Sequence, residues 1–337
     1  MRECSVHSHG LNLTLHPENA TTFSRRMVLL INRSIVCDLP KDTNTFYRLY
    51  PSLKESARPL LSQTHKSITS LGSLYVLQRE YAVVSPNDKY ISIVGTDNTT
   101  TCCSVIVRHS GSGVTSLGHF DGSGLENAVS EMVRKVQEYS TISGELGVLE
   151  LHIVGGFLDK RGYSETLAMQ LLYAFHRQLA HIHLVTACTC DLNNVLRGNT
   201  NYPIIYGISV NIKTGEIFPS TFVEKGPEFA LRSSRIFAGG SSDMQEVYET
   251  QMFIFKINPF NYEPMRGIEL WLNEGDDFIL QHLSTSPEAE PPHFVTDVKS
   301  ALSFIHQNPF PSVTVFPENR PLYFRKDEFG QWIPIRI

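Results

Sequence analysis

Cys102 and His119 are the residues of this chain whose types and spacing best suit nucleophilic chemistry. They lie on residues 102–109 and 114–120, two segments whose loosely alternating, β-branched pattern predicts the strands of a β-hairpin. A two-residue loop that begins with glycine suits a type II′ turn, so we predict Gly111-Ser112 as the loop. This turn sets the register and brings the thiol and the imidazole toward each other.

In that register, Cys102 lies opposite Asp121 and diagonal to His119, with Cβ atoms roughly 7–8 Å apart. Because successive strand residues point to opposite faces, Cys103 belongs to the other side of the hairpin. A slip of one residue would instead place Cys103 opposite His119. The apolar face with Cys103 is predicted to hold Val105, Val107, Val114 and Phe120, and the polar face with Cys102 to hold Ser104, Arg108, Thr115, His119 and Asp121.

A thiol beside an imidazole can carry out acyl transfer from an amide. The thiolate is the nucleophile, and a free cysteine with a pKa of about 8.5 is only slightly ionised at neutral pH. We expect a neighbouring imidazolium to raise the thiolate fraction and then to return the proton to the leaving group. Residues 96–101 read Thr-Asp-Asn-Thr-Thr-Thr, which offers hydroxyl groups to orient the ring and backbone N–H groups to bind an oxyanion.

The hairpin region at 95–122 and four other stretches together resemble one known family. The other stretches are LGSLYVLQREYAVVSP at 71–86, LHIVGGFLD at 151–159, YPIIYGISVNIKTGEI at 202–217 and LSTSPEAEPPHFV at 283–295. From about residue 27 to its C-terminus, the chain resembles protein N-terminal asparagine amidohydrolase, with the blocks in the same order. More distantly, the hairpin looks like that of bacterial chemoreceptor glutamine deamidases and of the catalytic domain of cytotoxic necrotizing factor.

The resemblance implies roles for three residues and a fold. The family's nucleophile ends a Thr-Thr-Cys segment, which falls on Cys102. The deamidase pattern of a cysteine, a histidine 17 residues later and an upstream hydroxyl residue falls on Cys102, His119 and Thr96. The distant relatives imply an α+β fold, a mostly antiparallel β-sandwich flanked by helices.

The resemblance also implies a function. Family members hydrolyse the side-chain amide of N-terminal asparagine in proteins and peptides, and the aspartate produced marks the protein for degradation through the N-degron pathway. Such an enzyme needs a subsite for the free α-ammonium, and Asp121, Asp97 and Glu80 are the nearest carboxylates in sequence, while Thr101 adjoins the nucleophile. The alternative is a non-catalytic module that binds peptide N-termini in the same pocket, in which Cys102 is merely packed.

The rest of the pattern predicts the elements that position the hairpin. Broken helical signals at 41–70 come first, and a proline-rich loop is predicted at 284–292. Predicted strands are 74–77, 81–84, 90–94, 148–154, 182–188, 204–211, 217–223, 252–257, 313–316 and 322–324, and predicted helices are 124–139, 163–179, 227–237, 276–283 and 295–306.

Charge and composition exclude several classes of protein. A net charge of -5 with interspersed signs predicts no nucleic-acid partner. No segment approaches the roughly 20 apolar residues of a membrane span, so no membrane association is expected. Six cysteines in 337 residues do not form a secreted disulfide framework, which favours the cytoplasm.

The remaining expectations concern metals and domains. Cys188 and Cys190, with His181 and His183 nearby, lack the usual spacing of a zinc site, so we expect neither a metal nor a cofactor. Residues 1–26 are rich in Ser, Thr, His and Asn and are predicted to be a disordered extension. Residues 27–337 contain no clear linker and are predicted to form one amidohydrolase domain, acting as a monomer.

Overall fold

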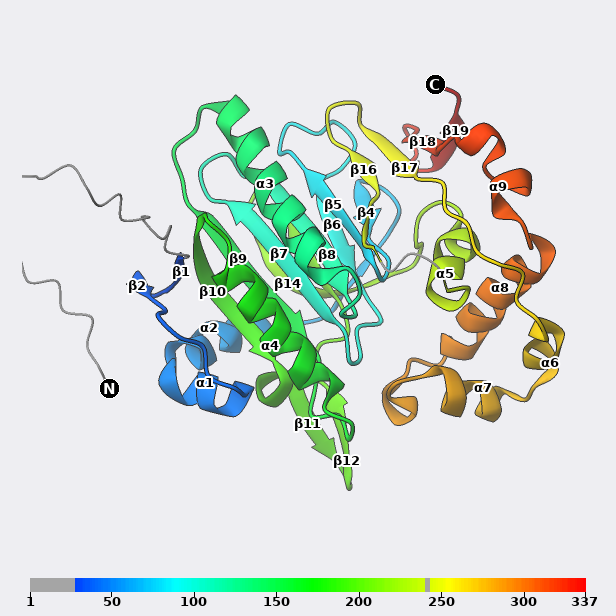
Figure 1. The fold of residues 1–337 in the computed structure, drawn as a ribbon. Coiled ribbons are helices and arrows are strands. Elements are labelled where there is room, and N and C mark those ends of the chain that lie inside the picture. Colours follow the sequence, from blue (N-terminus) through cyan, green and yellow to red (C-terminus); the bar gives the residue numbers. More distant parts are fainter. Residues whose placement is uncertain (1–27, 240–242) are drawn as a thin grey trace, which may run out of the picture.

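The chain folds into a mixed α/β structure built around an eight-stranded sheet (Figure 1). The computed structural model describes residues 28–239 and 243–337, so the predicted extension at 1–26 lies outside the described residues. The strand order in this central sheet is β15-β5-β8-β7-β9-β10-β1-β2. Its strands are β1 (Val28–Ile31), β2 (Ser34–Ile35), β5 (Glu80–Val84), β7 (Cys103–His109), β8 (Thr115–Phe120), β9 (Leu149–Gly155), β10 (His181–Thr189) and β15 (Gln245–Glu246).

The central sheet is covered on both faces because its strands carry apolar side chains on both. In β7, Val105 and Val107 belong to one core, whereas Ile106 belongs to another. Two helices cover the first face, and Figure 1 shows them in front of the strands and running roughly along them. These helices are α3 (Leu125–Ser143) and α4 (Tyr163–His176), which were predicted with slightly different ends.

A five-stranded sheet packs against the other face of the central sheet. Ile106 and Leu117 of the central sheet share a core with Val94 and Ile208 of this second sheet. Its order is β3-β14-β13-β6-β4, and β6 ends at Thr96, directly before the polar segment that leads to the hairpin. Its strands are β3 (Lys66–Ile68), β4 (Ser73–Tyr75), β6 (Ile93–Thr96), β13 (Ile208–Asn211) and β14 (Ile217–Phe222).

The C-terminal part adds helices with a small core of their own and a four-stranded sheet. Ile268, Ile279, Val298 and Leu302 form part of that core. In Figure 1 the helices that form this core, α6, α7 and α8, lie on the opposite side of the molecule from α1 and α2. The remaining elements are α1 (Thr43–Leu49), α2 (Ser52–Leu61), α5 (Phe229–Phe237), α6 (Ile268–Asn273), α7 (Asp276–Leu283), α8 (Phe294–Gln307), α9 (Pro311–Thr314), β11 (Asn194–Arg197), β12 (Thr200–Pro203), β16 (Tyr248–Glu249), β17 (Ile254–Ile257), β18 (Leu322–Lys326) and β19 (Trp332–Ile335).

The expectation of a mixed fold with sheets covered by helices is confirmed in outline. The expected antiparallel order holds for β5, β8, β7 and β9, but the β9–β10, β1–β10 and β5–β15 pairs are parallel. Parallel pairing of β9 with β10 follows from the α4 crossover that joins them. The likeness to the cytotoxic necrotizing factor fold and the single domain over 27–337 stay predictions.

Individual elements also depart from the predictions. The strand predicted at 313–316 is wrong, because Pro311–Thr314 forms α9, and proline is favoured in the first turn of a helix. Helix α6 and strand β19 had no clear sequence signal. Within the described ranges, no helix is long and apolar enough to cross a membrane.

The β7–β8 hairpin has the predicted register but a different turn. Ser104 pairs with His119, as expected. The glycine with positive φ is Gly113, at 72°, rather than Gly111, so the predicted type II′ loop is wrong. Hydrogen bonds close a loop of residues 110–113 instead. A four-residue loop keeps the register of a two-residue loop because it adds one residue on each side.

Candidate active site

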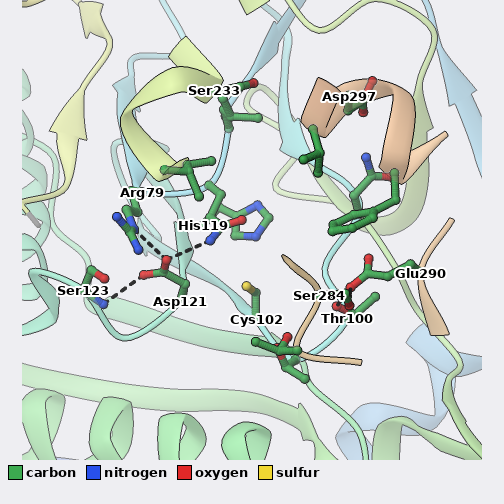
Figure 2. Close-up of a pocket in the computed structure, with 18 of the residues that line it drawn as sticks. Arg79, Thr100, Cys102, His119, Asp121, Ser123, Ser233, Ser284, Glu290 and Asp297 are labelled. Carbon is green, nitrogen blue, oxygen red and sulfur yellow. Dashed lines mark hydrogen bonds and ion pairs between the residues drawn. The ribbon is translucent and has the colours of Figure 1, made fainter. Parts of the chain in front are cut away.

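A cavity of about 540 Å³ opens where the hairpin meets the loop after β6, helix α5 and the start of α8. Figure 2 shows Arg79 and Asp121 on one side of Cys102, and Glu290 on the other. Thr96 and Glu80 were predicted for the site but lie outside its lining. The predicted residues that line it are Asp97, Thr101, Cys102, His119 and Asp121.

The two adjacent cysteines lie in different environments. Cys103 is fully buried in the core beneath α3 and α4, together with Val105, Val107 and Phe120. Cys102 directly precedes β7, is partly exposed and lines the cavity. The predicted separation of the two thiols between the faces of the hairpin is therefore confirmed.

Strand β9 approaches the Cys102 backbone so closely that it requires glycine. A Cβ atom on Gly155 would lie 2.6 Å from the Cys102 carbonyl oxygen, and Gly155 has a φ of 131°. The N–H of Gly156 donates to the same carbonyl at 2.8 Å. These contacts fix the main chain that carries the thiol.

Thr96 holds the ring of His119. Thr96 Oγ1 lies 2.7 Å from His119 Nδ1, and both side chains are buried. His119 Nε2 is also buried and makes no hydrogen bond to any described residue. In the tautomer that donates Nδ1–H to Thr96, Nε2 is unprotonated and can accept a proton on the cavity side.

Burial favours the neutral forms of the thiol and the imidazole. It lowers the pKa of His119 to about 4. It raises the pKa of Cys102 well above the usual value, and the charges of Asp121 and Glu290 raise it further, while Arg79 opposes the shift. The expected resting imidazolium is therefore wrong, because a ring with this pKa is neutral at neutral pH.

Asp121 faces the cavity but already has strong partners. Arg79 Nε donates to its Oδ2 at 2.6 Å, Gln78 Nε2 donates to the same oxygen at 2.8 Å, and the Ser123 N–H donates to Oδ1 at 2.9 Å. Although burial opposes ionisation, the Arg79 charge and these hydrogen bonds hold the pKa of Asp121 below its ordinary value. Its charge is balanced within the protein, which weakens it as a cation subsite.

Glu80 lies beneath the cavity rather than in it. Its side chain is fully buried and pairs with Arg232 at 2.6 Å and with Arg235 at 2.8 Å, both from α5. The Leu77 N–H also donates to it at 3.0 Å. Glu80 therefore holds α5 against the turn that precedes β5 and is not among the residues that line the cavity.

Asp97 and Thr101 line the cavity with partners of their own. Asp97 accepts hydrogen bonds from the Tyr75 hydroxyl at 3.0 Å and from the Phe222 N–H at 2.8 Å. Burial raises the pKa of Asp97. Thr101 Oγ1 lies 2.7 Å from Thr285 Oγ1, which joins the nucleophile segment to the loop before α8.

Glu290 is a cavity residue that the sequence did not reveal. It lies in the segment predicted only as a proline-rich loop, directly after the 3₁₀ turn Pro287–Ala289. Its Oε1 accepts from Ser284 at 2.6 Å and from Ser286 and Thr100 at 3.4 Å each, whereas Oε2 bonds to no described residue. Burial raises the pKa of Glu290, and these hydroxyls oppose that shift. The sequence signal that could have pointed to Glu290 is a carboxylate that closely follows several serine and threonine residues in a proline-rich loop.

The residues considered for zinc do not form a metal-binding group. Cys188 and Cys190 are buried, whereas His181 is exposed on the first residue of β10. In residues 28–239 and 243–337, no group of three or more His, Cys, Asp or Glu side chains could hold a metal ion.

A thiol and an imidazole that share a cavity, with a hydroxyl on the ring, form an arrangement typical of cysteine-dependent hydrolases. Residues 63–334 match the family model described as protein N-terminal asparagine amidohydrolase. The Homo sapiens protein of that name is 42% identical over 294 residues, covering 87% of this chain and 94% of that protein. The Arabidopsis thaliana protein of that name is 30% identical over 309 residues, covering 84% and 87%. The chain belongs to the protein N-terminal asparagine amidohydrolase family, as the resemblance indicated.

Proposed function

We propose that this chain hydrolyses the side-chain amide of N-terminal asparagine in proteins and peptides, giving N-terminal aspartate and ammonia. Family membership supports the reaction. The structural observation that carries it is the placement of Cys102 and His119 in one cavity, with Thr96 on the ring. A cytoplasmic location and a role in the N-degron pathway of protein degradation belong to the same proposal.

Catalysis begins with attack of the Cys102 sulfur on the amide carbon. Because both groups are neutral beforehand, the thiol proton moves to His119 Nε2 as the sulfur–carbon bond forms. The imidazolium then gives this proton to the amide nitrogen, ammonia leaves and a thioester remains. A water molecule, deprotonated by His119, attacks the thioester, which releases aspartate and restores the thiol.

Backbone N–H groups beside the nucleophile can stabilise the tetrahedral oxyanion. Those of Thr101 and Cys102 donate to no described residue. The N–H of Thr99 donates to the Tyr206 carbonyl at 2.8 Å, which fixes the loop that presents the other two. We assign the oxyanion to the Thr101 and Cys102 N–H groups.

The charged side chains that line the cavity carry more negative than positive charge, which favours binding of a cation. Apart from His119, six charged side chains line it. Two ion pairs, Arg79–Asp121 at 2.6 Å and Lys225–Asp297 at 3.1 Å, balance four of them. Both remaining side chains are carboxylates. An N-terminal residue differs from an internal one by its α-ammonium, so this surplus negative charge favours chain starts.

Glu290 is the better ligand for that ammonium. The other unbalanced carboxylate, Asp97, accepts a hydrogen bond on each oxygen, whereas Glu290 Oε2 bonds to no described residue. The Ser284 hydroxyl fixes Glu290 through Oε1. A close charge-assisted contact contributes about 1.5–3 kcal/mol.

A non-catalytic module that binds peptide N-termini is the second candidate. The observation that favours it is the raised pKa of Cys102, which is ordinary for a packed thiol. Such a module would bind an Asn-initiated peptide without releasing ammonia, and Cys102→Ala would leave that binding intact.

Ammonia release from matched peptides tests the proposed function. An Asn-initiated peptide should be hydrolysed, whereas its N-acetylated form and a Gln-initiated peptide should be poor substrates. Glu290→Gln should lower kcat/KM for the free peptide by about one to two decades, since that contact is worth about 1.5–3 kcal/mol.

Glu288→Gln is the matched control, because it removes an exposed carboxylate of the same loop that pairs with Lys160 at 2.6 Å. We expect it to behave as the wild type. Comparable ammonia release from the acetylated peptide would reject the ammonium subsite and indicate a general amidase. Absence of release from every peptide would favour the binding module.

A further inference from the structure

Arg79 occupies a backbone conformation that non-glycine residues rarely adopt. Its φ is 61°, in the left-handed region, where a side chain costs free energy that glycine avoids. Its N–H donates to the His119 carbonyl at 3.0 Å, and its carbonyl accepts from the Gln245 N–H at 2.9 Å. Because a non-glycine residue costs free energy in this conformation, the presence of an arginine beside the cavity indicates that its side chain has a function.

The turn that carries Arg79 is held from behind by a buried ion network. Glu80 accepts from the Leu77 N–H across this turn at 3.0 Å. Its carboxylate pairs with Arg232 at 2.6 Å and with Arg235 at 2.8 Å. Loss of Glu80 would leave the buried Arg232 charge without a counter-ion, so the network resists displacement. Arg79 is therefore fixed relative to β8 and α5.

The guanidinium of Arg79 faces the cavity near Cys102 (Figure 2). Its Nε–H donates to Asp121 at 2.6 Å, and Gln78 donates to the same oxygen at 2.8 Å. No other guanidinium N–H of Arg79 is bonded to a described residue, although arginine has several more donors. The side chain is 22% exposed and lines the cavity, so its positive charge lies at the cavity wall even though Asp121 offsets it in the net charge.

We propose that Arg79 is a further residue of the reaction, whose fixed guanidinium stabilises the negative charge that the Cys102 sulfur acquires during attack. This inference rests on the proposed role of Cys102 as nucleophile. Asp121 after β8 and Glu290 before α8 disfavour ionisation of the thiol, and the His119 ring is neutral at neutral pH. Among the described residues, Arg79 is the cation that acts in the opposite direction.

The positive charge of Arg79 is needed in the first step, when the Cys102 sulfur attacks the amide carbon. As the S–H bond breaks and its proton passes to His119 Nε2, the sulfur becomes negative before its electron pair is fully shared with the amide carbon. A positive charge held in place at low dielectric stabilises this arrangement without reorganising. Asp121 alone would oppose it, but by binding Arg79 the same carboxylate orients the stabilising charge.

The pH dependence of Cys102 alkylation tests the proposal without requiring turnover. Iodoacetamide modification of the Cys102 peptide is followed by mass spectrometry across a pH series. Arg79→Gly removes the guanidinium and suits the left-handed backbone, and Arg79→Lys restores a cation. Arg79→Gly should raise the alkylation pKa by about one unit and slow modification about tenfold below that pKa. Arg79→Lys should recover part of the loss.

Arg108→Gln is the control, because it removes a guanidinium from the far end of β7, where Arg108 faces Glu150 at 3.6 Å. It should leave the alkylation profile unchanged. If circular dichroism shows that the Arg79→Gly variant is unfolded, the Arg79→Asn variant replaces it, since asparagine tolerates this backbone conformation.

An unchanged profile in a folded Arg79 variant would overturn the proposal, even if ammonia release fell, since Arg79 would then act on substrate instead. Failure of the proposed function would show separately, as ammonia release that survives Cys102→Ala.

Discussion

Cys102 and Cys103 are adjacent in the sequence and identical in chemistry, yet they belong to two regions of the molecule with opposite character. Cys103 is enclosed between the central sheet and helices α3 and α4, where burial raises its pKa. Cys102 meets the cavity together with His119. The alternation of the pleat, rather than the residue type, decides which thiol can meet a substrate.

The buried histidines His119 and His152 also differ in whether they meet the cavity. Burial lowers the pKa of both His119 and His152 to about 4. His152 Nδ1 lies 3.1 Å from Thr186 Oγ1, much as His119 lies 2.7 Å from Thr96. His119 lines the cavity and His152 does not. A neutral histidine on a hydroxyl therefore does not by itself mark a site; His119 differs from His152 because it lines the cavity that Cys102 also lines.

Removal of each thiol should separate the two cysteines by their effect on ammonia release. Cys102→Ala should abolish ammonia release, whereas Cys103→Ala should keep much of the activity and lower the free energy of unfolding by about 1 kcal/mol. Peptide turnover and urea unfolding of both variants measure the two effects. Equal loss of turnover from two folded variants would contradict the assignment of the faces.

The two histidines should differ next. His119→Ala should lower kcat by about 10²–10⁴, because it removes the proton acceptor of the first step. His152→Ala should leave kcat nearly unchanged, since its ring lies outside the cavity. Initial rates at saturating peptide compare them, and a kcat for His152→Ala as low as that for His119→Ala would remove the contrast.

Thr96 should matter less than its partner His119. Thr96→Val removes the hydroxyl from Nδ1 at nearly constant volume and should lower kcat about tenfold, a loss of roughly 1.4 kcal/mol in the transition state. Thr96→Ser keeps the hydroxyl and should retain most of the rate. Full activity of Thr96→Val would show that the ring is oriented by its packing alone.

The two buried histidines also make a prediction about stability against pH. Both buried histidines have folded pKa values of about 4, below the ordinary 6.5. Between these values the unfolded chain binds protons that the folded chain does not, so stability falls as the pH falls, by about 1.4 kcal/mol per unit for each group. His152→Leu should halve this contribution in urea unfolding at several pH values. A slope equal to the wild type would refute it.

The sequence predicted the local part of the site and missed the long-range part. The alternation of β7 and β8 determined the faces of Cys102 and Cys103, because strand neighbours follow from the pleat. The contact of Thr96 with His119 came only from the resemblance. Glu290 had no periodic pattern to place it, since it reaches the cavity through a loop.

Charge pairing explains the other misses. Glu80 is close to the hairpin in sequence, but its partners Arg232 and Arg235 come from α5 and draw its carboxylate out of the cavity. Asp121 faces Cys102 as expected, yet Arg79 balances its charge. A carboxylate's role depends on which cations the fold brings to it, and a single sequence does not contain those pairings.

Interception of the thioester would show whether hydrolysis passes through a covalent intermediate on Cys102. Hydroxylamine competes with water for a thioester, so an Asn-initiated peptide turned over in its presence should yield the side-chain hydroxamate beside aspartate, both detected by mass spectrometry. Cys102→Ala should yield neither product, and Cys103→Ala should yield both. Aspartate formed without any hydroxamate, or formed by a folded Cys102→Ala variant, would contradict a covalent intermediate on Cys102.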